Sequence, residues 1–287
     1  MSVTNFHSIH EPLYEMHQDL CSIHRRAEAE GIKHIAMKIA VWSDIHGNTW
    51  ALTEVLRDLR TKKPDLIVNL GDSLYGPLQP KETYEILKQH DIISISGNED
   101  RLILDNIDRK SDNSTLQYVI ENLPDDALRW LQSLPRTKPL KCGVFHCHGT
   151  PQADTTYLLE HVHKGCVTVY DTATIEKSLV GIPQKIVLCG HSHVPGIVQT
   201  PERMIINPGS VGLNAYDDDH PSFHKIENFH NCSQYCLLEI DANDLRIEQI
   251  ALPYDVHQAA ACAANNGRND WASWLVTGRA SNLKAMS

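Results

Sequence analysis

The feature that most constrains this 287-residue chain is a set of short segments rich in Asp, His, Asn and Gly, each placed at the end of a probable strand. In chain order these are Ser43–Asn48, Gly71–Asp72, Gly97–Asp100, His148–Pro151 and Gly190–His193. A short apolar run bounded by turn residues indicates a buried strand. Because the carboxyl ends of parallel strands meet at one edge of a sheet, such strand ends can bring polar side chains together.

The order of the expected elements indicates an α/β fold. Strands are expected at residues 37–43, 65–70 and 91–96, with a helix capped by Asn48 and another near residues 80–90 between them. This alternation favours parallel connections. A helical stretch over 99–134 is broken near Asn113 and Pro124. Later strands, which predict a second sheet, are expected at 138–147, 184–189, 196–200, 203–207, 234–240 and 244–251.

The same pattern divides the chain into three parts. Residues 1–36 form an N-terminal extension, residues 37–253 the main domain, and residues 254–287 C-terminal helices that pack on that domain. Apolar residues at three- and four-residue steps predict an amphipathic helix over about 11–29. This helix would pack on the main domain or on a partner, which leaves a homo-oligomer open. The simpler interpretation is an appended arm with no part in the chemistry.

Composition and charge narrow the class of protein. With 41% hydrophobic and 22% charged residues, the chain has the composition of a soluble globular protein. It has no apolar run near the ~18 residues that span a bilayer, and its eight cysteines are scattered. Its first twenty residues carry Glu11, His17 and Asp19 and lack a continuous apolar region, so we expect no secretory signal. These features predict a cytoplasmic protein with reduced thiols and no membrane partner.

The formal net charge is −10, from 26 basic and 36 acidic residues. An extended nucleic-acid track normally needs a basic stripe, so this charge argues against one. It does not argue against a small phosphate ester, because bound divalent cations would reverse the local field.

Asp44 and His46 lie two positions apart in a segment expected to be extended, so their side chains should point the same way. One carboxylate and one imidazole suit a divalent metal, although a strand-end Asp can also cap the next helix. The helix that begins at Asn48 would aim backbone N–H groups at a phosphate. Asp72, at the end of the neighbouring strand, is the candidate for a carboxylate that bridges two cations.

The remaining candidates have weaker individual signals. Asn98 can ligate a metal or hydrogen-bond a phosphate, but an Asn after Gly97 is also an ordinary turn residue. His191 and His193 repeat the two-residue spacing. We favour His148 over His146 as a further ligand, because Gly149 allows the backbone to approach the site closely.

Taken together, these segments resemble the motif set of the calcineurin-like metallophosphoesterase superfamily. The matching motifs are Asp-x-His-Gly-Asn, Gly-Asp, Gly-Asn-x-Asp, His-Gly and Gly-His-x-His, and the segments Asn207–Gly212 and Gly71–Pro77 are similar to its small bacterial and archaeal phosphodiesterase-like branch. The resemblance covers residues 37 to about 252.

The resemblance implies a four-layer α-β-β-α sandwich of two mixed sheets, with a binuclear metal site at the carboxyl ends of the strands. Asp44, His46 and His193 would hold one ion, Asn98, His148 and His191 the second, and Asp72 would bridge them. The implied chemistry is hydrolysis of a phosphate mono- or diester by a metal-bridging hydroxide, with manganese expected first and iron, zinc or nickel as alternatives. Asn48, Asn98 and Tyr75 are the expected substrate contacts, although a turn-packing role for Tyr75 is equally open.

One position departs from the family pattern. Many members have a His after the Gly-Asn pair, which assists the leaving group, whereas this chain has Glu99 followed by Asp100. We therefore count Asp72, Asn98, Glu99 and Asp100 as candidate catalytic residues. General acid help is worth ~10²–10⁴ in rate, so a missing acid predicts a preference for esters with good leaving groups, unless Glu99 or a metal-bound water supplies the proton.

Two other functions compete with the enzyme. The first is a protein that keeps the fold but acts as a binding scaffold, which would not need all seven ligand types. The second is a metallo-β-lactamase-like hydrolase, which would be expected to cluster His-x-His-x-Asp-His in one segment. The sequence contains no such run.

Overall fold

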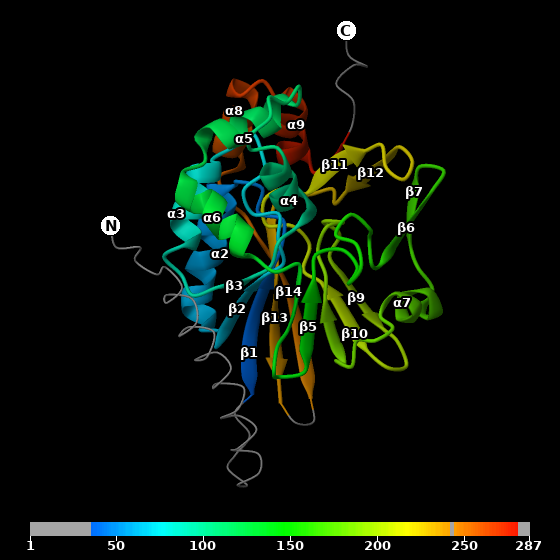
Figure 1. Ribbon diagram of the computed structural model, residues 1–287. Helices are drawn as coiled ribbons and strands as arrows, with labels where there is room; N and C mark the ends of the chain where they lie inside the picture. Colours follow the sequence, from blue (N-terminus) through cyan, green and yellow to red (C-terminus); the bar gives the residue numbers. More distant parts are fainter. Residues whose placement is uncertain (1–35, 242–243, 281–287) are drawn as a thin grey trace, which may run out of the picture.

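The computed structural model describes residues 36–241 and 244–280, and two five-stranded sheets form its core (Figure 1). The helix expected at residues 11–29 lies outside the described residues. The first sheet has the order β14 (Leu245–Leu252), β13 (Ser233–Ile240), β1 (Met37–Trp42), β2 (Leu66–Asn69) and β3 (Ile93–Ser94). The second has the order β4 (Thr137–Pro139), β5 (Val144–Cys147), β8 (Ile186–Leu188), β10 (Met204–Asn207) and β9 (Gly196–Gln199).

Each sheet combines parallel and antiparallel strand pairs. Strands β1, β2 and β3 are parallel, as are β5, β8 and β10. Strand β13 pairs antiparallel with β1, and β4 and β9 pair antiparallel with β5 and β10. The prediction of two mixed sheets is therefore confirmed. The single strand expected over 138–147 is wrong, because a turn at Gly143 divides it into β4 and β5.

The two sheets pack face to face through apolar side chains. Ile39, Val41 and Val68 of the first sheet meet Val144 and Leu188 of the second in one buried cluster. Such a shared apolar face contributes about 25 cal/mol per Å² removed from water. The outer face of the second sheet is covered by α7 (Thr172–Ser178), whose Ile175 is fully buried.

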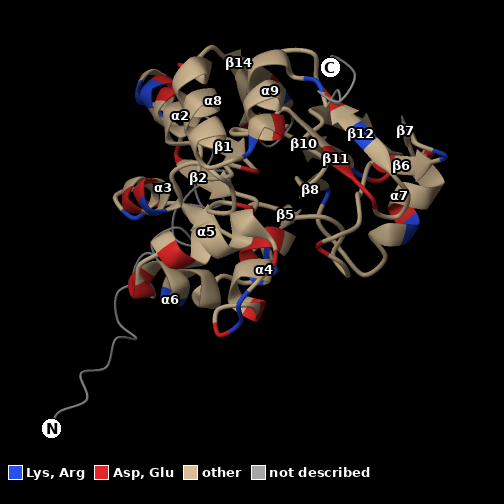
Figure 2. Cartoon of the chain, turned by 90° about the horizontal axis from the view of Figure 1, so that it is seen from above, with Lys and Arg blue, Asp and Glu red and all other residues tan. Residues whose placement is uncertain are grey.

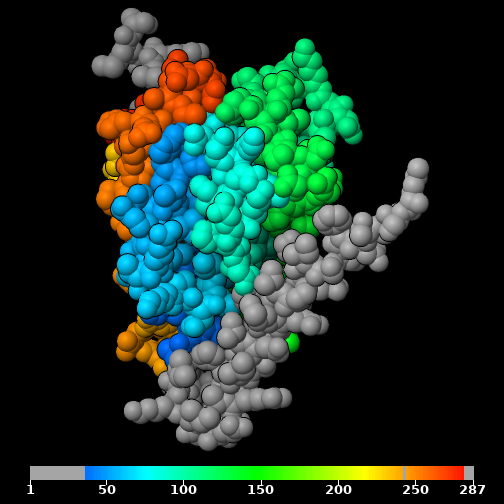
Figure 3. Space-filling view, turned by 90° about the vertical axis from the view of Figure 1, so that its left-hand side faces the viewer, coloured from blue at the N-terminus to red at the C-terminus, as the bar shows by residue number. Residues whose placement is uncertain are grey.

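Helices cover the outer face of the first sheet. Figure 3 shows α2 (Thr49–Lys62) beside α3 (Pro80–Leu87) on this face. Asn48 caps α2 as predicted, because its side chain accepts a hydrogen bond from the Ala51 N–H at 3.1 Å. The predicted apolar face of α2, which includes Leu52 and Val55, is buried. The order of layers is therefore helices, first sheet, second sheet and helix.

The helical stretch after β3 divides near both predicted breaks. It consists of α4 (Asn98–Asp105), α5 (Ser114–Asn122) and α6 (Asp125–Ser133), with Asn113 and Pro124 at the N-caps of α5 and α6. After β14, α8 (Val256–Asn265) and α9 (Asn269–Thr277) pack on α2 and on β11 (Ala215–Asp218) respectively. Within the described residues, none of the helices has the length and apolar character needed to cross a bilayer.

Two small hairpins were not predicted from the sequence. One pairs β6 (Glu160–His163) with β7 (Cys166–Val169), and the other pairs β11 with β12 (His224–Glu227). Strands β7 and β12 are in contact, so the hairpins lie side by side. The view from above in Figure 2 shows them on the side away from α2 and α3.

Candidate metal centre

The predicted ligands lie where parallel strands end. Asp44 follows β1, Asp72 follows β2, and Asn98 begins α4 just after β3. His148 follows β5, and His191 and His193 follow β8. Because the two sheets pack face to face, these loops meet at one end of the sandwich, and the seven side chains come together there.

The side chains form two adjoining groups. Asp44, His46 and His193 make one group, and Asp72, His148 and His191 make the other, with the ligand atoms of each group within 4.8 Å of one another. His148 Nε2 lies 3.2 Å from Asp72 Oδ2 and 3.9 Å from Asp44 Oδ1, so the groups are neighbours. Asn98 Oδ1 lies 3.0 Å from the same His148 nitrogen, which places the amide oxygen in the second group.

Five of the candidate ligands have left-handed backbone conformations. The φ angles are 57° at Asp44, 53° at His46, 52° at Asp72, 68° at His191 and 58° at His193. The expectation that Asp44 and His46 lie in an extended segment is therefore wrong. Non-glycine residues seldom adopt this conformation, because it costs of order 1 kcal/mol per residue. Residues that do adopt it are concentrated at functional sites. With this backbone conformation, the ligand side chains point toward the centre from loops that follow the strands rather than from the strands themselves.

Backbone hydrogen bonds hold these loops in place. The N–H groups of Asp44 and His46 donate to the carbonyls of Gly71 and Asp72, each at 3.0 Å. Gly97 lies so close to Asp72 that a Cβ would come within 2.1 Å of Asp72 Oδ1. The loop after β3 can approach the loop after β2 this closely because residue 97 is a glycine and has no Cβ.

Three of the histidines are oriented by backbone carbonyls. The Nδ1 atoms of His46, His148 and His193 donate to the carbonyls of Tyr75, Leu70 and Leu213 at 3.0, 2.8 and 2.6 Å. A carbonyl only accepts, so Nδ1 carries the proton and Nε2 faces the centre.

The centre is therefore a set of converging acceptors. His46 Nε2 and His193 Nε2 are 3.1 Å apart, and His193 Nε2 is 3.4 Å from Asp44 Oδ1. Asp44 is completely buried, and its Oδ1 has no hydrogen-bond donor. Imidazole nitrogens and carboxylate oxygens in this arrangement suit divalent cations, so the residues present fit a binuclear metal centre.

The pKa values of these side chains show that the buried cluster favours positive charge. Burial alone would raise the pKa of Asp44, but His193, His148 and His46 hold it well below its usual range. Burial would lower the pKa of His148, whereas Asp72 and Asp44 raise it to about 10. Burial likewise opposes the charged form of His46, but Glu99, Asp72 and Asp44 raise its pKa to about 9.

Asp100 is fully buried and acts as a backbone clamp. Its carboxylate accepts from the N–H groups of Asp72, Ser73 and Gly97 at 2.8, 3.1 and 3.0 Å. These bonds tie the loop after β2 to the loop after β3. Burial, with the Asp72 charge second, raises the pKa of Asp100 to about 6.

Glu99 lies behind His46. One carboxylate oxygen is 3.1 Å from His46 Nδ1, the nitrogen that also faces the Tyr75 carbonyl. Burial is the main cause that raises the pKa of Glu99 to about 7. His46, Asp72 and Glu99 also form a third group of neighbouring ligand atoms. A carboxylate behind a ligand histidine fixes the ring and raises its basicity.

Two residues expected to touch substrate are engaged with the protein. The Asn48 amide donates to the Gly212 carbonyl at 2.9 Å and to the Tyr254 hydroxyl at 3.2 Å. The Tyr75 hydroxyl accepts from Asn113 Nδ2 at 3.0 Å. Both Asn48 and Tyr75 are buried.

His146 of β5 and His148, which directly follows β5, have different surroundings. His148 reaches the centre, whereas both ring nitrogens of His146 are buried without a hydrogen-bond partner. Burial lowers the pKa of His146 to about 3, so its ring is neutral.

Sequence reasoning missed several aromatic side chains around the centre. Trp271 of α9 packs edge-on against His46, with ring centroids 5.8 Å apart. Tyr157 and Tyr216 pack against His191 and His193, with centroids 4.9 and 4.6 Å apart. These residues are far from the ligand motifs in the chain, and no local pattern marks them.

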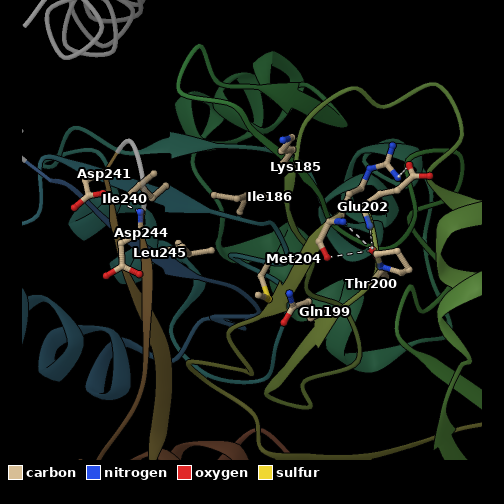
Figure 4. A pocket seen from close by; sticks show the side chains of 12 residues that line it. Lys185, Ile186, Gln199, Thr200, Glu202, Met204, Ile240, Asp241, Asp244 and Leu245 are labelled. Carbon is tan, nitrogen blue, oxygen red and sulfur yellow. Dashed lines mark hydrogen bonds and ion pairs between the residues drawn. The ribbon is translucent and has the colours of Figure 1, made fainter. Parts of the chain in front are cut away.

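A cavity of about 370 Å³ lies at the opposite end of the sandwich (Figure 4). Its lining includes Ile186 and Met204 of the second sheet and Ile240 and Leu245 of the first. Ile240 pairs with Met37, the first residue of β1, so the cavity lies at the amino ends of the parallel strands. None of the candidate ligands lines it.

Comparisons with known proteins show the family and the fold. Residues 37–228 match the family described as the calcineurin-like phosphoesterase superfamily domain. An uncharacterised protein of Methanocaldococcus jannaschii is 25% identical, over 81% of this chain and 94% of its own length. The structure is similar to that of a metallophosphoesterase from Sphaerobacter thermophilus, with a TM-score of 0.67 and 21% identity over 85% of this chain and 100% of the other. A hypothetical protein from Pyrococcus horikoshii has a TM-score of 0.64 and 20% identity over 84% and 98%.

Proposed function

Since the chain belongs to the calcineurin-like phosphoesterase superfamily, we propose that it hydrolyses a small phosphate mono- or diester at a centre of two divalent metal ions. The observation that carries this proposal is the convergence of Asp44, His46, Asp72, Asn98, His148, His191 and His193, with their acceptor atoms facing one another. A surface that only bound a partner would not need this buried set of acceptors.

Each ligand has a proposed place. Asp44, His46 and His193 would hold the first ion, and Asn98, His148 and His191 the second. Asp72 would serve both, since it belongs to the second group and also adjoins His46 and Glu99. When bound, two such ions supply positive charge to the phosphoryl oxygens and lower the pKa of a coordinated water. Manganese, iron, zinc and nickel all suit this mixed donor set.

The chain's own residues position these groups. We assign Asp100 the role of holding the loops that carry Asp72 and Asn98, because it accepts three backbone hydrogen bonds there. Glu99 lies 3.1 Å from His46 Nδ1 and would add negative charge on that side of the ring. We do not extend the proposal to a direct substrate contact by Asn48, because its side chain is occupied by protein partners.

The role of Glu99 affects substrate choice. The Glu99 oxygen nearest His46 lies 3.1 Å from Nδ1, on the side of the ring opposite the Nε2 that faces the centre, and it has no hydrogen-bond partner among the described residues. In this position Glu99 would not take the place of the family's usual histidine beside the leaving group. We therefore propose faster hydrolysis of esters with good leaving groups. Equal rates from aryl to alkyl esters would contradict this part of the proposal.

The test is hydrolysis of aryl phosphate mono- and diesters by chelator-stripped protein, with manganese, nickel, zinc or magnesium restored one at a time. Turnover should require metal and should be lost in Asp72→Asn. Asp125→Asn, an exposed change at the start of α6, is the matched control and should retain the activity. The ratio of monoester to diester rates would then assign the substrate class.

Metal content measured on the same samples separates the alternatives. Two ions per chain without turnover on any ester would favour the binding scaffold. Fewer than two ions per chain would contradict the binuclear assignment itself.

A further inference from the structure

His191 differs from the other ligand histidines in the way its ring is held. The rings of His46, His148 and His193 each donate from Nδ1 to a backbone carbonyl. Among the described residues, the His191 ring has no hydrogen-bond partner; only its backbone is bonded, by its N–H to Asp44 Oδ2 at 3.2 Å and by its carbonyl. The ring instead lies between the rings of His148 and Tyr157, with centroids 5.0 and 4.9 Å away.

Tyr157 is itself fixed by a buried chain of hydrogen bonds. His224 Nδ1 donates to the Ser222 carbonyl at 2.9 Å, so its Nε2 accepts from the Tyr157 hydroxyl at 2.9 Å. The Tyr216 hydroxyl lies 2.6 Å from the Tyr157 hydroxyl and 3.2 Å from the His191 carbonyl. We call Tyr157, Tyr216 and His224 the tyrosine chain.

The tyrosine chain links the two hairpins to the metal centre. Tyr157 precedes β6, while Tyr216 and His224 lie on β11 and β12 (Figure 1). Tyr216 also packs on His193, with ring centroids 4.6 Å apart and planes tilted by 60°. The tyrosine chain therefore contacts the rings of both histidines in the Gly-His-Ser-His motif. The His193 ring is also held by a hydrogen bond to the Leu213 carbonyl, whereas the His191 ring depends on packing.

We propose that the tyrosine chain is a positioning device that sets the affinity of the second ion separately from that of the first, the second ion being the one held by Asn98, His148 and His191 with the shared Asp72. This inference rests on the proposed function. A ligand ring that no hydrogen bond orients must be oriented by packing, and the Tyr157 ring provides that packing. Partners that orient metal ligands typically change metal affinity by about 10- to 100-fold.

The test is titration of Mn²⁺ into chelator-stripped protein, with two dissociation constants resolved by calorimetry. Tyr157→Leu, which removes the ring, should weaken one ion by about 10- to 100-fold and the other by less than about threefold. The weakened constant should be the one that His191→Ala also weakens. Tyr157→Phe keeps the ring and loses the two hydrogen bonds of the hydroxyl, to Tyr216 and His224, so it should weaken that ion only about two- to tenfold.

Tyr170→Leu is the matched control, because Tyr170 directly follows β7 and its ring stacks on His161, which is not a candidate ligand. It should leave both constants unchanged. Equal weakening of both ions in Tyr157→Leu and Tyr157→Phe, or no weakening in either, would overturn the inference. If wild-type protein binds two ions but hydrolyses no ester, the proposed function fails while the titration still decides this inference. Fewer than two ions in the wild type would overturn both.

Discussion

Replacing Glu160 by Gln should stabilise the protein at alkaline pH and have little effect in acid. Glu160 lies on β6 with 5% of its surface exposed, and burial raises its pKa to about 7 from an ordinary 4.5, although the Ser192 hydroxyl opposes the shift. No described residue forms an ion pair with it. At 1.36 kcal/mol per pKa unit, the ionised carboxylate costs the folded state about 3 kcal/mol.

The sign follows from where the proton is bound. Between pH 4.5 and about 7 the folded protein keeps the Glu160 proton and the unfolded chain loses it, so stability falls as the pH rises through this window. Below pH 4.5 both states are protonated, and above about 7 the full cost is present. Glutamine is neutral throughout, so Glu160→Gln removes only the part of the pH dependence that this carboxyl causes.

The assay is urea unfolding of wild type and Glu160→Gln at pH 5, 6, 7 and 8 under identical metal conditions. The difference in free energy of unfolding should grow from under about 1 kcal/mol at pH 5 to about 3 kcal/mol at pH 8. The metal ligands titrate in both proteins, so their contribution cancels in the difference. Glu121→Gln, an exposed change on α5, should give a difference that does not vary with pH. A pH-independent difference for Glu160→Gln would refute the reasoning.

Three further changes test the geometry of the centre. Gly97→Ala would place a Cβ 2.1 Å from Asp72 Oδ1 and should cost about 1–3 kcal/mol of stability, measured by urea unfolding, and reduce bound metal. Asp100→Asn leaves at least one of three backbone donors without an acceptor, so it should cost about 1–3 kcal/mol in the same assay. Restoring Mn²⁺ to stripped protein at about 100 times its dissociation constant should raise the free energy of unfolding by about 2.7 kcal/mol per ion, and with it the melting temperature. Asp72→Asn should lose part of this gain.

Much of the fold could be predicted because its signals are local. The apolar face of α2, its cap at Asn48 and the break at Pro124 each depend on neighbours within a few residues, and the structure has all three. The two hairpins were missed because β6, β7, β11 and β12 are each only four residues long, and all but β7 are rich in polar residues. Their pairing and their packing on one another decide their conformation, and neither is visible in one short segment.

The candidate ligands could be located because their residue types and order are unusual, but their supports could not. The carbonyl of Leu213 orients His193, and Trp271 packs on His46 across more than 200 positions of sequence. Tyr157 and Glu160 carry no motif that distinguishes them from ordinary core residues. The sequence therefore indicates what the centre contains, whereas the arrangement of its surroundings depends on long-range packing.

Asp44 and His46 lie together as their spacing predicted, but the cause is their left-handed backbone conformation and not the alternation of side chains along a strand. Alternation along a strand would place both side chains on one face, but β1 ends at Trp42 and the two residues turn inward from a loop. That loop is held by the segment that follows β10 of the second sheet, since the N–H groups of Val211 and Gly212 donate to the Ser43 and Asp44 carbonyls at 3.0 Å. A strained loop of this kind persists only where its surroundings fix it. The ligand geometry of the first sheet therefore requires the second sheet to be docked, and metal binding should report on the assembled sandwich rather than on either sheet alone.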